Sequence, residues 1–297
     1  MTRYFFILII LCSNVSANEL LNITFLGTGN PRPNIDKLGP SVLIKVKNEE
    51  IMLDVGRGAT LRLTQIGNNY SQIDNIYISH LHFDHIIGIP DFWLTSNLWQ
   101  KKTDTNIFGP IGIKKFCDGV RKSFSKDLEY RYSGNNYSKI ICSNYSEKKV
   151  IKNNFLTVIS FENDHGHIDY SHGFKVLYKN KSIVYSGDTT YSKEVVKNAK
   201  NCDILIHEII AATKKIHDNN KKLRGVISTH TNISQLIKVL NEANPKLTIL
   251  NHALLFGVSE EYVLNEVKKS YDGNVIFSKD LMSVDLGEEI NIFNIGN

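Results

Sequence analysis

Short apolar runs rich in β-branched residues alternate with polar, turn-forming residues along the first part of the chain. These runs are LLNITFLG (20–27), SVLIKV (41–46), IMLDV (51–55) and IDNIYIS (73–79). Runs of this length and composition predict strands. Longer segments with helical patterning predict helices, and they are RGATLRLTQIG (57–67), GIPDFWLTSNLW (88–99) and IKKFCDGVRKSF (113–124).

The second part of the chain repeats this alternation after a polar segment, 126–154, that gives no clear prediction. Strands are predicted at 155–161, 173–178, 182–187, 203–208 and 247–252, and helices at 233–243 and 259–271. Two β-rich halves that each carry helices predict an α+β fold. In this fold two sheets pack face to face, and the helices lie outside them.

The N-terminus has a different pattern. MTRYFFILIILCSNVSA begins with a basic residue, continues with a short apolar run and ends in small residues before Asn18. This pattern predicts a signal peptide over 1–17, followed by a mature domain over 18–297. The apolar run is shorter than the roughly 20 residues that span a bilayer. We therefore expect a periplasmic or secreted protein with no stable membrane span after cleavage.

Composition narrows the function classes. The chain has 297 residues, 42% of them hydrophobic, which suffices for one large core. Its net charge of +5 comes partly from lysine clusters such as Lys221-Lys222, which we interpret as solvated loops rather than a nucleic-acid surface. Cys117, Cys142 and Cys202 remain after signal removal, so at most one disulfide can form.

One segment, ISHLHFDHIIG (78–88), concentrates potential metal ligands. It places His80, His82, Asp84 and His85 within six positions, directly after a predicted strand. His80 and His82 can reach one point and Asp84 and His85 a neighbouring point, so the pattern favours two adjacent metals. Further donors follow predicted strands along the chain: Asp164, His165, His167, Asp188, His207, Glu208, His230 and His252.

HLHFDH resembles the H-x-H-x-D-H signature of the metallo-β-lactamase superfamily. Other family motifs follow in order between about residues 20 and 285, namely TFLGTGNPRP, IMLDVGRGATLRL, SGDT, HE, THT and NH. The resemblance implies an αββα four-layer sandwich with two mixed sheets and outer helices. Among the branches, the chain resembles the ribonuclease Z and arylsulfatase group, and it is closer to the arylsulfatase-type members.

The resemblance also implies roles for individual residues. The first metal would take His80, His82 and His165, the second would take Asp84, His85 and His252, and Asp188 would bridge both. His165 is preferred to His167 because DHG and its distance to Gly173 resemble the arylsulfatase-type pattern. Asp84, Glu208 and His230 are the predicted catalytic residues, and Asp54 is predicted to orient a ligand.

The main prediction is an exported dinuclear-metal hydrolase of ester bonds. A hydroxide between two divalent ions, zinc before manganese or iron, would attack a sulfate ester or a phosphodiester. The expected partner is a small anionic ester, and a homodimer stays open. The alternative is a ribonuclease Z-type tRNA 3′-processing endonuclease or phosphodiesterase. Export and the lack of a Gly/Pro-rich tRNA-gripping arm disfavour nucleic acid.

Three further classes of function are compatible with this fold. A β-lactamase is disfavoured by Asp188 and by the pair Glu208 and His230, which point to the other branch. A glyoxalase or lactonase shares the metal ligands and stays open. A non-catalytic metal-binding module predicts missing ligands, whereas every ligand position is filled here.

Overall fold

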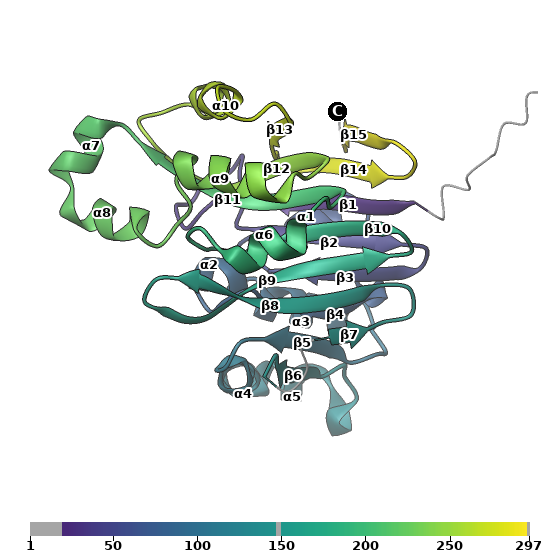
Figure 1. The fold of residues 1–297 in the computed structure, drawn as a ribbon. Helices are drawn as coiled ribbons and strands as arrows, with labels where there is room; N and C mark the ends of the chain where they lie inside the picture. The colour runs from purple at the N-terminus through teal and green to yellow at the C-terminus, as the bar shows by residue number, and fades with distance from the viewer. Residues whose placement is uncertain (1–19, 147–149, 296–297) are drawn as a thin grey trace, which may run out of the picture.

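Two β-sheets pack face to face, and helices cover their outer faces (Figure 1). The structure is a computed structural model, which describes residues 20–146 and 150–295. The predicted α+β sandwich is thereby confirmed. The predicted signal peptide, 1–17, lies outside the described residues.

The first sheet has eight strands, and the chain crosses it mostly between neighbours. Its order is β15 (Ile290–Asn294), β14 (Met282–Leu286), β1 (Leu21–Gly27), β2 (Ser41–Val46), β3 (Glu49–Leu53), β4 (Ile73–Tyr77), β5 (Thr105–Gly109) and β6 (Ile140–Asn144). The pairs from β15 to β3 are antiparallel and those from β3 to β6 are parallel. The carboxyl ends of β3, β4 and β5 therefore share one edge.

The second sheet has seven strands. Its order is β13 (Asn274–Phe277), β12 (Leu247–Phe256), β11 (Ile204–Ala212), β10 (Lys181–Tyr185), β9 (Ile168–Tyr178), β8 (Thr157–His165) and β7 (Val150–Lys152). Strands β10 to β13 are parallel, and β7 to β10 are antiparallel. This sheet is mixed, as the resemblance implied.

Alternating side chains fill the space between the sheets. On β1, Leu21, Ile23 and Phe25 are fully buried in one cluster with residues of the second sheet such as Val176 and Ile206. This period of two is the geometry of a strand that packs one face on the core. This inter-sheet layer is one of three apolar clusters among the described residues.

The opposite faces of the sheets pack against helices. On the first sheet these are α1 (Ala59–Gln65), α3 (Ile89–Leu98) and α4 (Ile113–Ser123). On the second they are α6 (Lys193–Ala199), α9 (Ile233–Ala243) and α10 (Glu260–Lys268). The remaining α-helices described are α2 (Phe83–Ile86), α5 (Ser125–Arg131), α7 (Lys214–Asn219) and α8 (Lys221–Ile227).

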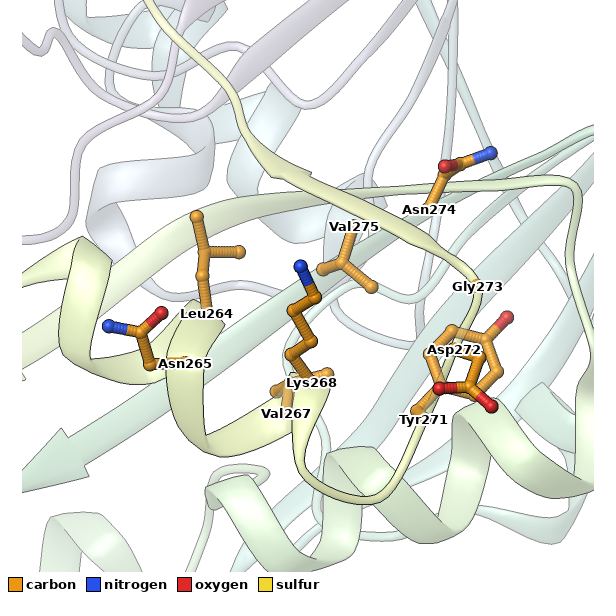
Figure 2. Close-up of a pocket in the computed structure, with 9 residues that line it drawn as sticks. All are labelled: Leu264, Asn265, Val267, Lys268, Tyr271, Asp272, Gly273, Asn274 and Val275. Atoms are coloured by element: carbon orange, nitrogen blue, oxygen red, sulfur yellow. The ribbon is translucent and has the colours of Figure 1, made fainter.

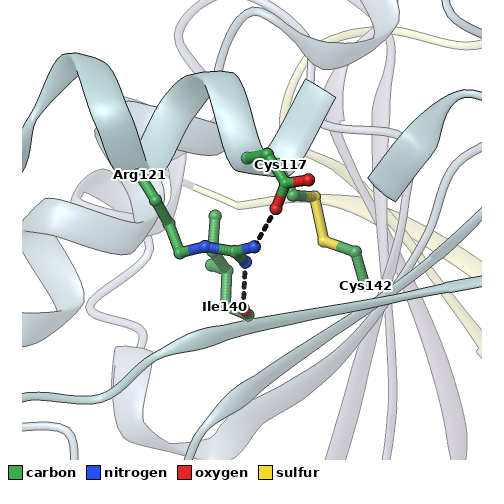
Figure 3. Close-up of a disulfide and its surroundings, with 5 residues drawn as sticks. Cys117, Arg121, Ile140 and Cys142 are labelled. Carbon is green, nitrogen blue, oxygen red and sulfur yellow. Dashed lines mark hydrogen bonds and ion pairs between the residues drawn. A yellow bond between two sulfur atoms is a disulfide. The ribbon is translucent and has the colours of Figure 1, made fainter. Parts of the chain in front are cut away.

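A disulfide fixes helix α4 to the edge of the first sheet. Cys117 of α4 and Cys142 of β6 are bonded, and their neighbour Arg121 donates a hydrogen bond of 2.9 Å to the Ile140 carbonyl (Figure 3). Cys202 is buried as a free thiol. The prediction of at most one disulfide agrees with this arrangement.

Among the residues that the structure describes, no helix has the length and apolar character needed to cross a bilayer.

Candidate dinuclear metal site

The histidine segment lies between β4 and α3, held by the loop that follows β3. Val55 N–H donates to the His85 carbonyl at 2.8 Å, and Gly88 N–H donates to the Val55 carbonyl at 3.0 Å. A Cβ at Gly56 would lie 2.6 Å from the Asp84 carbonyl oxygen, closer than side-chain atoms approach. Gly56 therefore lets the Asp-x-Gly turn lie directly against the segment that carries the ligands.

The second sheet supplies the other donors. Asp188 follows β10 after Gly187, whose φ of 59° lies in the left-handed region. A Cβ at Gly187 would lie 2.5 Å from the His172 carbonyl oxygen, so this tight turn requires glycine. The turn directs Asp188 toward the histidine segment of the first sheet.

The position of His252 differs from the prediction that all ligands follow strand ends. It lies inside β12, where the pairing with β11 skips it between Asn251 and Ala253. Its φ of 49° marks a β-bulge residue in the left-handed region. A bulge re-aims a side chain without ending the strand, and here it turns His252 toward the site.

The structure brings His80, His82, His165 and Asp188 into one group. The closest atoms are His80 Nε2 and His82 Nδ1, 2.8 Å apart, and His165 Nε2 lies 3.4 Å from His82 Nδ1. Burial lowers the pKa of His80 well below its ordinary value and that of His82 to about 4. Neutral imidazoles that face one another in this way are suited to share a cation.

Asp84, His85 and His252 form a neighbouring group. Asp84 Oδ2 lies 3.2 Å from His252 Nε2 and 3.6 Å from His85 Nε2. Asp188 reaches both groups, because its Oδ2 lies 3.5 Å from His85 Nε2 and 3.7 Å from His80 Nε2. The structure thus places Asp188 between the two groups, where the resemblance put the bridging ligand.

Two buried nitrogen atoms of the second group indicate that these residues could bind a metal ion. His85 Nε2 and His252 Nδ1 are buried and make no hydrogen bond. Burial opposes a positive charge on His85, yet Asp188, Asp54 and Asp84 together raise its pKa well above its ordinary value. Unpaired nitrogens amid carboxylates that favour positive charge are the surroundings that a divalent cation satisfies. The donor set therefore fits divalent metal ions.

Asp54 fixes the orientation of the His85 ring through Nδ1, whereas Nε2 of the same ring faces Asp84 and Asp188. Asp54 Oδ2 accepts hydrogen bonds of 2.8 Å from His85 Nδ1, Ser79 Oγ and Tyr185 Oη, and its Oδ1 accepts one of 2.7 Å from Ser79 N–H. With the proton on Nδ1, the lone pair of His85 Nε2 is left for a metal. Similarly, His165 Nδ1 lies 2.7 Å from the Thr229 carbonyl, which leaves its Nε2 for the first group.

Glu208 and His230 form a hydrogen-bonded pair, and His230 also lies in a third group of potential donors with Asp188 and His252. Glu208 Oε1 lies 3.1 Å from His230 Nδ1 and also accepts from the N–H groups of Thr231 and Thr189. Burial disfavours charge on His230, but Glu208 outweighs it and raises the pKa of His230 to about 9. His230 is therefore held as a buried proton donor at neutral pH.

A cavity of about 630 Å³ opens onto both groups and onto His230. Its lining includes His82, Asp84, Asp188 and His252 from the donor groups, and also Phe83. Helix α8, on the left of Figure 1, contributes residues including Lys222 to the same cavity. The metal ligands therefore face a pocket of the size that binds small molecules.

The other candidate donors lie outside these groups. His167 is exposed on the cavity wall, whereas His165 is buried with His80 and His82. Asp164 is exposed and accepts from Gly166 N–H, and His207 is buried in β11. A smaller groove between α10 and β13 contains none of the predicted donors (Figure 2).

The fold and these two donor groups define a hydrolase of the metallo-β-lactamase superfamily. Relatives agree with this class: a ribonuclease Z from Mycobacterium marinum is 24% identical over 90% of this chain and 99% of its own. The metallo-β-lactamase fold protein YhfI from Bacillus subtilis superposes with a TM-score of 0.70 at 17% identity over 90% of this chain and all of its own. The short form of human tRNase Z gives 0.66 at 22% identity over 90% and 99%.

The family can be stated more narrowly. The model of the anti-Pycsar protein Apyc1 family matches residues 21–250, most of the chain, and the chain belongs to this family. These relatives support the ribonuclease Z side of the sequence prediction better than its arylsulfatase side.

Proposed function

We propose that the protein is a metal-dependent phosphodiesterase that hydrolyses a phosphodiester in the cavity above the two donor groups. The observation that carries this proposal is the position of His230, a buried imidazole beside the ligands and on the cavity wall. Hydrolysis of a phosphodiester expels an alkoxide, which needs a proton as it leaves. A sulfate or phosphate ester with a phenolate leaving group depends less on such a donor.

Each part of the site has a role in this proposal. Two divalent ions would be held by His80, His82, His165, Asp84, His85, His252 and Asp188, and these histidine and carboxylate donors favour zinc. Bound ions supply a nucleophile at neutral pH and positive charge for the phosphate oxygens. His230 gives its proton to the leaving oxygen, and Glu208 holds the imidazole in place. Asp84 lines the cavity, and its proposed role is to orient the nucleophile that attacks the phosphorus atom.

RNA is the second candidate substrate. It is favoured by ribonuclease Z from Mycobacterium marinum, which aligns over 99% of its own length. The segment 126–154, in which a tRNA-gripping arm could lie, folds mainly as α5, a 3₁₀ turn (Ser133–Asn135) and the strands β6 and β7 where it is described. These elements pack at the edges of the two sheets, which favours a small diester over tRNA.

The test compares four substrates with zinc-loaded protein that begins at Asn18. They are bis(4-nitrophenyl) phosphate, 4-nitrophenyl sulfate, a nucleoside methyl phosphate and a tRNA with a 3′ extension. We expect diester turnover that disappears in Asp188→Ala, because this change removes the carboxylate shared by both donor groups. Turnover of the sulfate alone would overturn the proposal. Cleavage of the RNA alone would show instead that the protein is a tRNA-processing nuclease.

We also propose export to the periplasm or the exterior. The support is the signal-like sequence of 1–17 together with the disulfide between Cys117 and Cys142, since disulfides persist in oxidising compartments. Sequencing the N-terminus of the protein from a cell fractionation checks this. Asn18 at the N-terminus in the exported fraction is the expected result, and protein retained in the cytosol with Met1 would contradict it.

A further inference from the structure

Ser79 lies between strand β4 and His80, outside all the groups of potential metal donors. It is fully buried, as are its neighbours Asp54 and His80. Its Oγ has two partners within hydrogen-bond distance, Asp54 Oδ2 at 2.8 Å and His80 Nδ1 at 3.1 Å. A single hydroxyl therefore connects a buried carboxylate to a residue of the first donor group.

The chemistry of these three side chains determines the direction of both hydrogen bonds. A carboxylate oxygen only accepts, so the one proton of the Ser79 hydroxyl goes to Asp54. The hydroxyl then offers only a lone pair to His80, so His80 Nδ1 carries the proton of that bond. Nε2 of His80 keeps its lone pair and lies 2.8 Å from His82 Nδ1. A histidine with this arrangement is ready to bind a metal ion through Nε2.

Backbone contacts and close packing keep Ser79 in place. Its N–H donates to Asp54 Oδ1 at 2.7 Å, and its carbonyl accepts from His172 N–H of β9 at 2.9 Å. A Cβ at Gly187 would lie 3.0 Å from Ser79 Cβ, so the turn before Asp188 packs directly against this residue. Ser79 is therefore held by residues of both sheets.

The same carboxylate also holds a histidine of the second group. Asp54 Oδ2, which accepts from Ser79, lies 2.8 Å from His85 Nδ1 as well. One oxygen atom is thus connected to one histidine of each group, directly to His85 and through the Ser79 hydroxyl to His80. Hydrogen-bond partners of this kind fix the ring of a metal-bound histidine and raise the basicity of its ligand atom.

We infer that Ser79 is a positioning residue that extends the influence of Asp54 to His80, so that one buried carboxylate orients one histidine at each of the two metal positions. The inference rests on the metal dependence of the proposed function and is independent of the substrate. Loss of the Ser79 hydroxyl should weaken the first position alone, whereas loss of the Asp54 charge should weaken both.

Site-resolved metal binding tests the inference. NMR of cadmium bound in place of zinc should give two resonances, and each can be assigned by its loss in His82→Ala or His252→Ala. Titration with a competing chelator then gives an affinity for each position. Ser79→Ala should lower the affinity of the first position by about 10- to 100-fold and leave the second at the wild-type value.

A second serine provides the matched control. Ser41 is also fully buried, and its hydroxyl donates a hydrogen bond of 3.0 Å to the backbone carbonyl of Asp54 instead of its carboxylate. Ser41→Ala should therefore leave both affinities unchanged. Asp54→Asn should weaken both positions. When Ser79→Ala is added to Asp54→Asn, the further loss at the first position should be small, because the two residues act through one chain of hydrogen bonds.

The ring proton of His80 gives an independent readout. In zinc-loaded protein with isotope-labelled histidine, the proton on His80 Nδ1 should exchange slowly with water, and Ser79→Ala should make this exchange faster. Equal losses of affinity at both positions in Ser79→Ala, or no loss at the first, would overturn the inference and leave the proposed function standing. If the wild-type protein binds neither zinc nor cadmium, the metal-dependent function fails and the inference fails with it.

Discussion

Single residues outside the donor groups determine how the ligands are presented. Asp54 has no place in either group, yet its carboxylate receives four hydrogen bonds, one of them from His85 Nδ1. Asp54→Asn preserves shape and removes the charge that favours the proton on Nδ1. We expect zinc affinity to fall by about 10- to 100-fold, as for other partners of metal-bound histidines. Competition with a coloured chelator measures it.

The matched control for this change is Tyr185→Phe. It removes one hydrogen bond to Asp54 Oδ2 and leaves the carboxylate in place, so the loss of affinity should be smaller. Identical zinc affinity in wild type and Asp54→Asn would show that Asp54 is only a turn residue.

The role of His230 can be tested by comparing how much its substitution lowers kcat for substrates with different leaving groups. His230→Gln should lower kcat by roughly 10²–10⁴-fold for a diester that expels methoxide, since general acids contribute factors of this size. A diester that expels 4-nitrophenolate needs little protonation and should lose much less. Steady-state kinetics on both substrates, with Glu208→Gln as the milder variant, gives the comparison. Equal losses on both would place His230 in binding rather than proton transfer.

At the level of helices and strands, the sequence is most informative where the pattern is local. Helix α9 lies at 233–243 as predicted, because Asn232 and Gln235 form a capping box ahead of a regular apolar face. Strand β2 also has its predicted bounds. The pattern does not predict strands β5, β6, β7, β13, β14 and β15, because each has only three to five residues, too few for a clear alternation.

The site was predictable in its residues but not in its geometry. The order of motifs predicted seven ligands that the structure brings into neighbouring groups of potential donors, but it did not predict that His230 lies in a third group with Asp188 and His252. The sequence around His252 does not predict the bulge in β12. This bulge depends on the pairing of β12 with β11, which is distant in the sequence. The apolar wall of the cavity comes from Pro31, Val226 and Leu254, and local patterns carry no information about such distant neighbours.

One prediction at this level concerns the parallel strands of the second sheet. Asp203, which precedes β11, accepts hydrogen bonds of 2.8 Å from Ser182 N–H in β10 and from Lys246 Nζ before β12. Burial opposes the charge of Asp203, but these two donors outweigh it and lower its pKa below the ordinary value. The ionised carboxylate therefore links the starts of three strands.

The sign of the pH dependence follows from this shift. Because the folded pKa lies below the unfolded value of about 3.9, Asp203 stabilises the fold above that pH, and the contribution is lost as pH falls through the folded pKa. Asp203→Asn should cost about 1 kcal/mol or less at pH 7, since Lys246 is largely exposed. Urea unfolding at several pH values should show this difference shrinking in acid; a constant difference would contradict the assignment.

For the whole molecule, the two donor groups lie where the sheets meet. Four donors come from the segment between β4 and α3 of the first sheet, and three come from β8, β12 and the turn after β10 of the second. Bound ions would therefore connect the sheets, and their binding energy would add to the stability of the fold. Removal would also leave Asp54, Asp84 and Asp188 buried close together.

Metal removal should consequently lower the melting temperature. An ion present at a thousand times its Kd adds about 4 kcal/mol to the free energy of unfolding. Each kcal/mol shifts the melting temperature by about 2–4 °C in proteins of about 150–250 residues. We expect a fall of more than about 10 °C after dialysis against a chelator, and recovery when zinc is added back. Calorimetry measures the change, with Asp188→Ala as the control that should respond little. An unchanged melting temperature after proven metal loss would mean that the sheets are held by the inter-sheet core alone, and that the donors serve chemistry without contributing to the fold.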